Sequence, residues 1–359
     1  MKKDFIFNAV IYILIFILSF SGIMLIYGSR LESQYGFGAA DFAVRQFCYM
    51  LTGFILMDRI RRIDCRKLLS ASPVLFAIGL IILWGVLFFG VKINGMRGWY
   101  SLYYFYIQPS ELFKFIYVLF ICRIFMQIEN KEKAFLYAGA VSALWIGAVL
   151  LQPDYGTAVL YVLSLGIISF LAGVKMRILF LLPAAMASSL IIFIARKEYG
   201  FRRLYGFFSE NADITGSAWH WKQFQLTIAR GGWFGNKTDG AFWSNNYLPF
   251  AYNDSAYAAL HEITGFAGAL CILLLFFTIF IIIYKHSFNM NYRFIILSGA
   301  GTVLAHALLH CSVNCALIPT TGLTLPFISY GGSSLAGMFM LYGIILSFCN
   351  TEKNNSCSH

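Results

Sequence analysis

Residues 6–27 read IFNAVIYILIFILSFSGIMLIY and contain no charged side chain. An apolar helix of this length spans the roughly 30 Å hydrocarbon core of a bilayer. Its apolar residues surround the whole helix, whereas a surface helix of a soluble protein carries a single apolar stripe. No small-residue cleavage site follows the block. We therefore expect a retained transmembrane helix here and not a signal peptide.

The composition extends this expectation to the whole chain. Apolar residues make up 59% of it and charged residues 12%, and the mean hydropathy is +0.71. A soluble domain carries about 25% charged residues. Further apolar blocks lie at 42–57, 70–91, 112–128, 134–151, 156–173, 178–195, 257–284, 294–317 and 330–349. The sequence predicts an all-α polytopic membrane protein with about ten transmembrane helices. Residues 1–359 form one domain, with a long extracytoplasmic loop at 196–256 between helices seven and eight. The sixth block is short and follows Gln-Pro-Asp-Tyr-Gly, which is compatible with a broken helix.

The distribution of basic residues predicts the orientation. If the N-terminus is inside, the short outer loops hold only Arg30, Lys92 and Arg97, with Arg45 at a border. Cytoplasmic segments of membrane proteins are enriched in Lys and Arg. The inner segments hold Lys2, Lys3, Arg59, Arg61, Arg62, Arg66, Lys67, Arg123, Lys131, Lys133, Lys175, Arg177, Lys285, Arg293 and Lys353. We expect both termini in the cytoplasm. The net charge of +11 is then a topology signal, and we expect no nucleic-acid partner because the charges form no single basic face.

The first polar group combines Asn94 to Trp99 with the motif Gln108-Pro109-Ser110-Glu111 and Lys114. Pro109 can begin a helix. Glu111 and Lys114 are three residues apart and can pair on one helix face. The pair could neutralise itself inside the bundle or form the floor of a polar cavity. The spacing leaves both open.

The second polar group is Gln152-Pro153-Asp154, where Asp154 is expected to cap the next helix. The third is the loop at 196–256, which is outside and yet basic, with Arg203 among its cations. Paired phosphates suit the planar fork of Arg; a general attraction to anionic headgroups is the alternative. The aromatic residues of this loop suit a segment at the membrane interface.

Asp254 closes this loop just before the eighth block. A carboxylate there can cap the helix or act as a general base toward a positioned hydroxyl. The glycine-rich turn at 230–235 lacks the Lys-Ser/Thr of a nucleotide-binding P-loop.

The last group, at 319–334, holds prolines and glycines at membrane depth. Irregular backbone is tolerated there only where it is packed in protein or lines a cavity. His306, His310 and Asn314 share one helix face and predict an interhelical hydrogen-bond stripe. Cys311 and Cys315, beside His310, could bind a metal, but packing cysteines are favoured.

Together these groups resemble the SEDS family of bacterial membrane proteins (shape, elongation, division and sporulation), the RodA/FtsW/SpoVE type. Pro326-Phe327-Ile328-Ser329-Tyr330-Gly331-Gly332-Ser333-Ser334 is similar to its C-terminal signature. The 94–114 and 152–157 motifs, the Arg203, Gly216, Gln223 and Gly231-Gly232 pattern, and Leu248-Pro249 with Asp254, Glu262 and Gly265 follow the family in order.

The resemblance implies a peptidoglycan glycosyltransferase that polymerises lipid II, an undecaprenyl-diphosphate-linked muropeptide, on the outer face of the bacterial cytoplasmic membrane. It implies a class B penicillin-binding protein as partner. It makes Asp254 the catalytic residue, acting directly or through a divalent cation such as Mg²⁺ or Mn²⁺, with no organic cofactor. The substrate-binding residues implied are Arg97, Trp99, Glu111, Lys114, Asp154, Arg203, Gln223, Gly231, Gly232, Pro326, Ser329 and Gly331.

The chain departs from the family pattern around Asp254. Phe250 and Tyr252 stand where the family has Glu and His, and His306 and His310 stand where Gln and Asn are usual. A divergent member is therefore expected. Two other functions stay open: a flippase for lipid-linked precursors and an inactive scaffold for the penicillin-binding protein. The residues do not separate elongation, division and sporulation.

Overall fold

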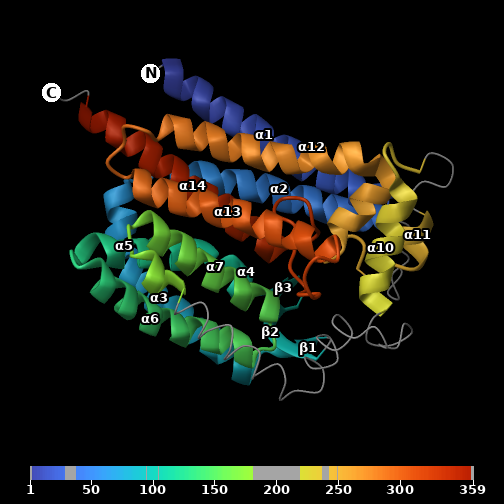
Figure 1. Ribbon diagram of the computed structural model, residues 1–359, viewed down its shortest axis with the longest axis horizontal. Helices are drawn as coiled ribbons and strands as arrows, with labels where there is room; N and C mark the ends of the chain where they lie inside the picture. The colour runs from blue at the N-terminus through green and yellow to red at the C-terminus, as the bar shows by residue number, and fades with distance from the viewer. Residues whose placement is uncertain are drawn as a thin grey trace.

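The computed structural model describes residues 2–28, 38–93, 95–103, 105–180, 219–236, 242–248 and 250–356. Its long helices run side by side in one bundle, with both ends of the chain at the same end of the molecule (Figure 1). They are α1 (Lys2–Gly28), α2 (Ala39–Arg61), α3 (Cys65–Phe89), α5 (Lys114–Gln127), α6 (Lys131–Leu151), α7 (Tyr155–Leu171), α12 (Ala256–His286), α13 (Arg293–Asn314) and α14 (Gly332–Ser356).

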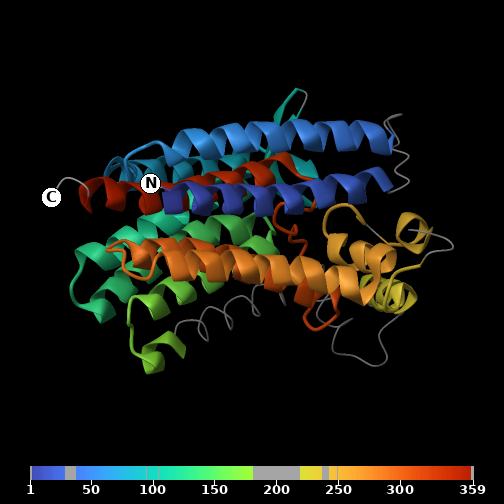
Figure 2. The same ribbon diagram turned by 90° about the horizontal axis from the view of Figure 1, so that it is seen from above.

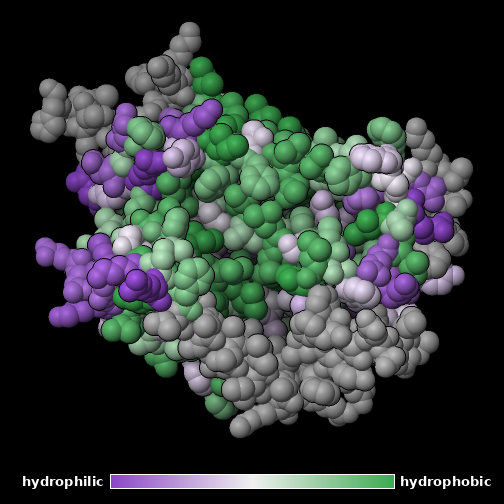
Figure 3. Space-filling view, viewed as in Figure 1, coloured by the Kyte–Doolittle hydropathy of each residue, from purple (hydrophilic) through white to green (hydrophobic). Residues whose placement is uncertain are grey.

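Six of the described helices are long and apolar enough to cross a membrane: α1, α3, α6, α12, α13 and α14. The shorter apolar helix α7 continues from Tyr155 to Leu171, so it is not broken. On the face shown in Figure 3, hydrophobic side chains cover the middle of the bundle and polar side chains gather toward its two ends. The multi-pass all-α class is confirmed. The number ten stays a prediction, because the block at 178–195 lies almost wholly outside the described residues.

Short elements collect at the end of the bundle opposite the termini (Figures 1 and 2). They are the strands β1 (Val91–Ile93), β2 (Met96–Leu102) and β3 (Phe105–Ile107), and the helices α4 (Pro109–Leu112), α10 (Trp219–Gly231) and α11 (Phe242–Asn246). The strands form an antiparallel sheet in the order β1-β2-β3. Hydropathy did not predict this sheet, because its strands are too short to carry a pattern.

Close backbone contacts place the signature segment within the bundle. A methyl group added to Gly22 of α1 would collide with the carbonyl of Ile328. A methyl group on Gly337 of α14 would likewise collide with the carbonyl of Glu111 in α4. Glycine at both positions lets helix backbones approach closely, as small residues do in membrane bundles. The signature loop, residues 319–331, thus lies against α1, and the helix α14 that follows it packs against α4.

Candidate functional site

A buried ion pair lies where α4 meets α5. Pro109 is the first residue of α4, as predicted, and three residues of helical spacing bring Lys114 Nζ to 2.7 Å from Glu111 Oε2. Both residues are almost fully buried, at 1% and 4% exposure. A pair this deep must be well hydrogen-bonded, because each ion has lost its water.

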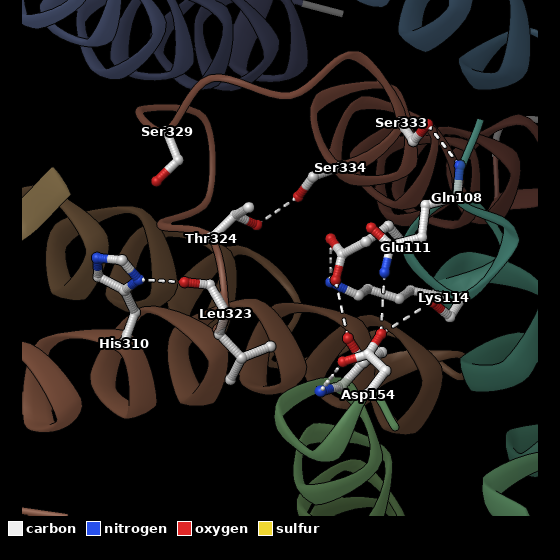
Figure 4. Close-up of polar contacts among 12 residues, drawn as sticks. Gln108, Glu111, Lys114, Asp154, His310, Leu323, Thr324, Ser329, Ser333 and Ser334 are labelled. Carbon is white, nitrogen blue, oxygen red and sulfur yellow. Dashed lines mark hydrogen bonds and ion pairs between the residues drawn. The ribbon is translucent and has the colours of Figure 1, made fainter. Parts of the chain in front are cut away.

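The neighbouring helix completes the hydrogen bonding of this pair. Asp154 caps α7 and accepts from the backbone N–H of Thr157 at 3.1 Å, which confirms the predicted cap. It also accepts from Gln108 Nε2 at 2.9 Å and Ser110 Oγ at 3.2 Å. The Thr157 hydroxyl donates to Glu111 Oε1 at 3.1 Å. These side chains form one interconnected group (Figure 4), which we call the buried polar cluster: Gln108, Ser110, Glu111, Lys114, Asp154 and Thr157.

The signature loop at 319–331 is irregular, as expected, and it is fixed by its own polar atoms. Ser329 Oγ accepts from the backbone N–H of Leu325 at 2.7 Å and donates to the Asn253 carbonyl at 2.6 Å. The backbone N–H of Tyr330 donates to the Tyr252 carbonyl at 2.8 Å. The loop therefore holds the segment immediately before Asp254.

Gln46 of α2 is a contact that sequence reasoning missed. It is fully buried, and its amide donates to the Ser329 carbonyl at 3.0 Å and accepts from the Gly331 N–H at 3.4 Å. A glutamine inside the apolar block at 42–57 was the available signal, since polar side chains at membrane depth usually have a partner.

Asp254 lies two residues before α12 and is only partly buried. Its carbonyl accepts from Asn314 Nδ2 at 3.0 Å, and Asn314 Oδ1 accepts from the N–H of Ala258 at 3.1 Å. A methyl group added to Gly322 would lie 3.6 Å from Asp254 Oδ2, in ordinary contact. Burial raises the pKa of the nearby Tyr252 phenol, and the Asp254 carboxylate adds to this rise. The backbone at Asp254 is thus fixed, and the residue as a whole is partly exposed.

The predicted stripe on α13 is confirmed at Asn314 and also at His310, whose Nδ1 lies 2.8 Å from the Leu323 carbonyl. His306 is fully buried on the same helix. Cys311 is a buried free thiol. In the described part of the chain, no three His, Cys, Asp or Glu side chains gather in a way that could hold a metal ion.

The start of α14 joins the buried polar cluster to the signature loop. Ser333 Oγ accepts from the backbone N–H of Gln108 at 3.0 Å. The hydroxyl of Ser334, one residue later, lies 2.7 Å from Thr324 Oγ1 in the loop. Figure 4 shows these two contacts on either side of one helix end. The two groups of residues therefore belong to one continuous polar region.

Helix α10 packs against α12 through the glycine turn at 231–235. Gly231 lies against the His261 carbonyl so closely that a methyl group would clash. Gly265 interrupts α12 with a φ of 70° and a ψ of −174°, a conformation open essentially to glycine alone. The N–H of Phe266, just beyond this kink, donates to the Gly232 carbonyl at 2.9 Å. Glycine is required here because the backbones of the two segments touch. Gln223, also in α10, is buried.

The predicted site residues fall into separate places. The structure brings together Glu111, Lys114 and Asp154, and connects Ser329 and Gly331 to the segment at Asp254, with Pro326 in the same loop. Gln223, Gly231 and Gly232 belong to the α10–α12 contact.

Arg97 is exposed and donates to the Leu87 carbonyl at 3.1 Å, so it is not in the buried polar cluster. Trp99 of β2 is half-buried. Arg203 lies outside the described residues.

Comparison with known proteins identifies the family. The model of the FtsW/RodA/SpoVE family, described as cell cycle protein, matches residues 8–354. The chain belongs to this family. A probable peptidoglycan glycosyltransferase FtsW of Wigglesworthia glossinidia brevipalpis is 31% identical over 96% of this chain and 93% of its own. A protein of the same name from Coxiella burnetii is 30% identical, with 90% of each chain covered.

Solved structures of similar fold cover nearly all of this FtsW/RodA/SpoVE-family protein. A chain from a peptidoglycan synthase complex aligns with a TM-score of 0.76 at 23% identity, covering 95% of this chain and 97% of its own. The rod shape determining protein RodA of Thermus thermophilus aligns with a TM-score of 0.68 at 22% identity, covering 95% and 96%. At these identities the likeness establishes the fold, and the multi-pass membrane architecture with it.

Proposed function

We propose that this protein is a peptidoglycan glycosyltransferase that polymerises lipid II on the outer face of the cytoplasmic membrane, in elongation, division or sporulation. The observation that carries the proposal is the placement of Asp254. Its backbone is held by Asn314, and the segment before it by Ser329, yet the residue is partly exposed. The relatives named peptidoglycan glycosyltransferase support this function.

In the proposed reaction Asp254 acts as the general base. Its carboxylate accepts the proton of the acceptor sugar hydroxyl as that oxygen bonds to the anomeric carbon of the donor. The bond between that carbon and the donor diphosphate breaks, and the lipid diphosphate leaves with the electron pair. A positioned base of this kind typically contributes a factor of about 10² to 10⁴ to the rate. The phenol of Tyr252 lies within electrostatic reach of this carboxylate, since the Asp254 charge adds to the rise in its pKa that burial causes.

The buried polar cluster supports the site in this proposal and does not bind the diphosphate directly. Lys114 is 1% exposed and already paired with Glu111, so it offers no open cationic face. We assign Glu111, Lys114 and Asp154 to positioning Gln108, whose backbone N–H donates to Ser333 at the start of α14. Arg97 and Arg203 remain proposed ligands of the diphosphate, Arg97 from the exposed hairpin.

A divalent cation, Mg²⁺ or Mn²⁺, fits this site only as an ion shared with the substrate. Asp254 supplies one carboxylate, and the neighbouring Asn253 Oδ1 is buried without a hydrogen-bond partner. Mg²⁺ is commonly held by one or two carboxylates together with substrate phosphates. When bound, the cation would neutralise charge on the leaving diphosphate. Asp254 and Asn253 are the residues that would hold it.

We further propose that both termini face the cytoplasm and that the end bearing α10, α11 and the sheet faces outward. The support is the excess of Lys and Arg in the segments at the opposite end. A class B penicillin-binding protein is the proposed partner, supported by the likeness to a chain of a peptidoglycan synthase complex.

The test is polymerisation of purified lipid II by this protein with its penicillin-binding partner, comparing wild type with Asp254→Ala. We expect glycan strands from wild type and at least a hundredfold less from the variant. Asp41→Ala is the matched control, since Asp41 is an exposed cap of α2 that accepts from the Gly38 N–H at 2.9 Å. It should polymerise at the wild-type rate.

Equal product from wild type and Asp254→Ala would remove the role given to this carboxylate. Absence of product from both, with labelled precursor crossing liposomes that contain the protein, would identify a flippase. Absence of both activities, with the partner still recruited, would identify a scaffold.

A further inference from the structure

An apolar groove runs along the membrane-facing side of the bundle between α1 and α12. It has a volume of about 380 Å³ and is lined by Phe16, Ile17, Phe20, Ser21, Met24, Leu25, Leu260, Ile263 and Thr264. None of these side chains is charged. Phe16, Ile17, Phe20 and Met24 are each more than 40% exposed, so the groove opens toward the hydrocarbon.

Both walls of the groove lead to the candidate site. The wall on α12 ends at Thr264, directly before the kink at Gly265. Leu260 on that wall is six residues after Asp254, or about 9 Å along a helix. The wall on α1 includes Ser21, and its neighbour Gly22 touches the backbone of Ile328, one residue before Ser329. The groove thus begins beside the two segments that form the site.

The depth of the groove matches one leaflet of a bilayer. Phe16 and Leu25 are nine residues apart, which is about 13 Å along a helix. Half of the roughly 30 Å hydrocarbon core is about 15 Å. At the opposite end of the bundle α1 and α12 touch, since the rings of Phe7 and His286 stack with centroids 3.6 Å apart. The groove is therefore confined to the half of the bundle that bears the site.

These features suit the chain of a lipid whose headgroup lies at Asp254. A lipid diphosphate in the same leaflet would place its phosphates at the site and its hydrocarbon below them. Burial of apolar surface is favourable by roughly 25 cal/mol per Å², although a chain leaving bulk lipid gains only the difference in packing. Selectivity for the substrate chain over bulk lipid must then come from the shape of the groove. The Gly265 kink and the aromatic rings of Phe16 and Phe20 set that shape.

We propose that the α1–α12 groove is the binding site for the polyprenyl chain of a substrate lipid diphosphate. This inference rests on the proposed function, because it assigns the hydrocarbon part of the same substrate. The width of the groove is set by residues outside the polar site. The main ones are Ser21 and Thr264, the two small polar side chains among the apolar ones.

The first experiment measures occupancy without requiring activity. The photoreactive residue benzoylphenylalanine replaces Phe20 in the full-length protein, which is reconstituted in phosphatidylglycerol vesicles that contain a small fraction of lipid II. We expect crosslinks to the polyprenyl lipid far above its mole fraction. The same residue in place of Ile13, which is exposed on α1 outside the groove, should crosslink in proportion to the vesicle composition.

The second experiment fills the groove. Ser21→Phe should raise the KM for lipid II about tenfold, the equivalent of about 1.4 kcal/mol, with kcat unchanged. An analogue with a single isoprene unit in place of the polyprenyl chain, too short to fill the groove, should show no change in KM. Ile13→Phe is the matched control. Ile13 is exposed on the same helix and does not line the groove, so this variant should behave as wild type.

The proposal is overturned if the Phe20 and Ile13 probes both follow bulk composition, or if the Phe20 probe crosslinks a transmembrane helix of the partner in place of lipid. It is also overturned if Ser21→Phe leaves the KM for lipid II unchanged. If the Phe20 probe crosslinks the polyprenyl lipid selectively but the wild-type protein makes no glycan, the proposed function is wrong. The assignment of the groove would still hold.

Discussion

Asp154 in the buried polar cluster and Asp254 beside the signature loop are two acidic residues that differ in burial. Asp154 is 3% exposed and accepts three hydrogen bonds, from Gln108, Ser110 and Thr157. At Asp254 the backbone carbonyl accepts from Asn314 Nδ2 at 3.0 Å, and the residue is partly exposed. The enclosed carboxylate of Asp154 is held in place by protein donors and out of reach of a substrate, whereas the carboxylate of a partly exposed residue can meet one. In the proposed mechanism the buried carboxylate therefore supports the fold, and the partly exposed Asp254 at the outer edge of the polar region carries the chemistry.

The largest expected effect in the buried polar cluster comes from Lys114→Met. The change leaves the Glu111 carboxylate buried without its cation, which typically costs about 3–5 kcal/mol of stability. Thermal unfolding in detergent micelles would measure it. The double variant Glu111→Gln with Lys114→Met removes both charges and should recover most of the loss. If Lys114→Met is as stable as wild type, the ion pair does not stabilise the fold. The contrast between the buried polar cluster and Asp254 is then wrong.

A smaller effect is expected from Gln46→Leu, which acts on the other region. It leaves the Ser329 carbonyl and the Gly331 N–H without their side-chain partner, at a cost of about 1–3 kcal/mol. Because the signature loop holds the segment before Asp254, polymerisation should fall together with stability. Thr52→Val on the same helix is the control, since Thr52 is exposed and bonds only within its own helix. Wild-type activity in Gln46→Leu would mean that the loop does not need α2.

The smallest effect on stability is expected from Arg97→Ala. Arg97 is exposed and donates to a single carbonyl at the end of α3, so its removal should change stability by no more than about 0.5 kcal/mol. Polymerisation kinetics then isolate its proposed contact with the diphosphate. A raised KM for lipid II would support that contact, and an unchanged KM would show that the hairpin arginine has no part in the site.

Sequence reasoning found the buried pair and the Asp154 cap for a simple reason. Both are local: Glu111 and Lys114 are three residues apart, as are Asp154 and Thr157, and helix geometry alone brings such residues together. It could not find Gln46, which meets the signature loop from 283 residues away. Nor could it find the kink at Gly265, whose need for glycine arises from the approach of a second backbone at Gly232 and Trp233.

The sequence by itself determined the membrane class, the family and the residues able to do chemistry, because hydropathy and motif spacing are properties of the chain. Only the tertiary structure decided which of those residues share a place. It buried Lys114 in an ion pair with Glu111 and left Arg97 exposed on a hairpin. It also opened a groove between α1 and α12, helices that the sequence separates by more than two hundred residues. The physical reason is that burial, cavities and backbone contact depend on how helices pack, and no local pattern records which helices will be neighbours.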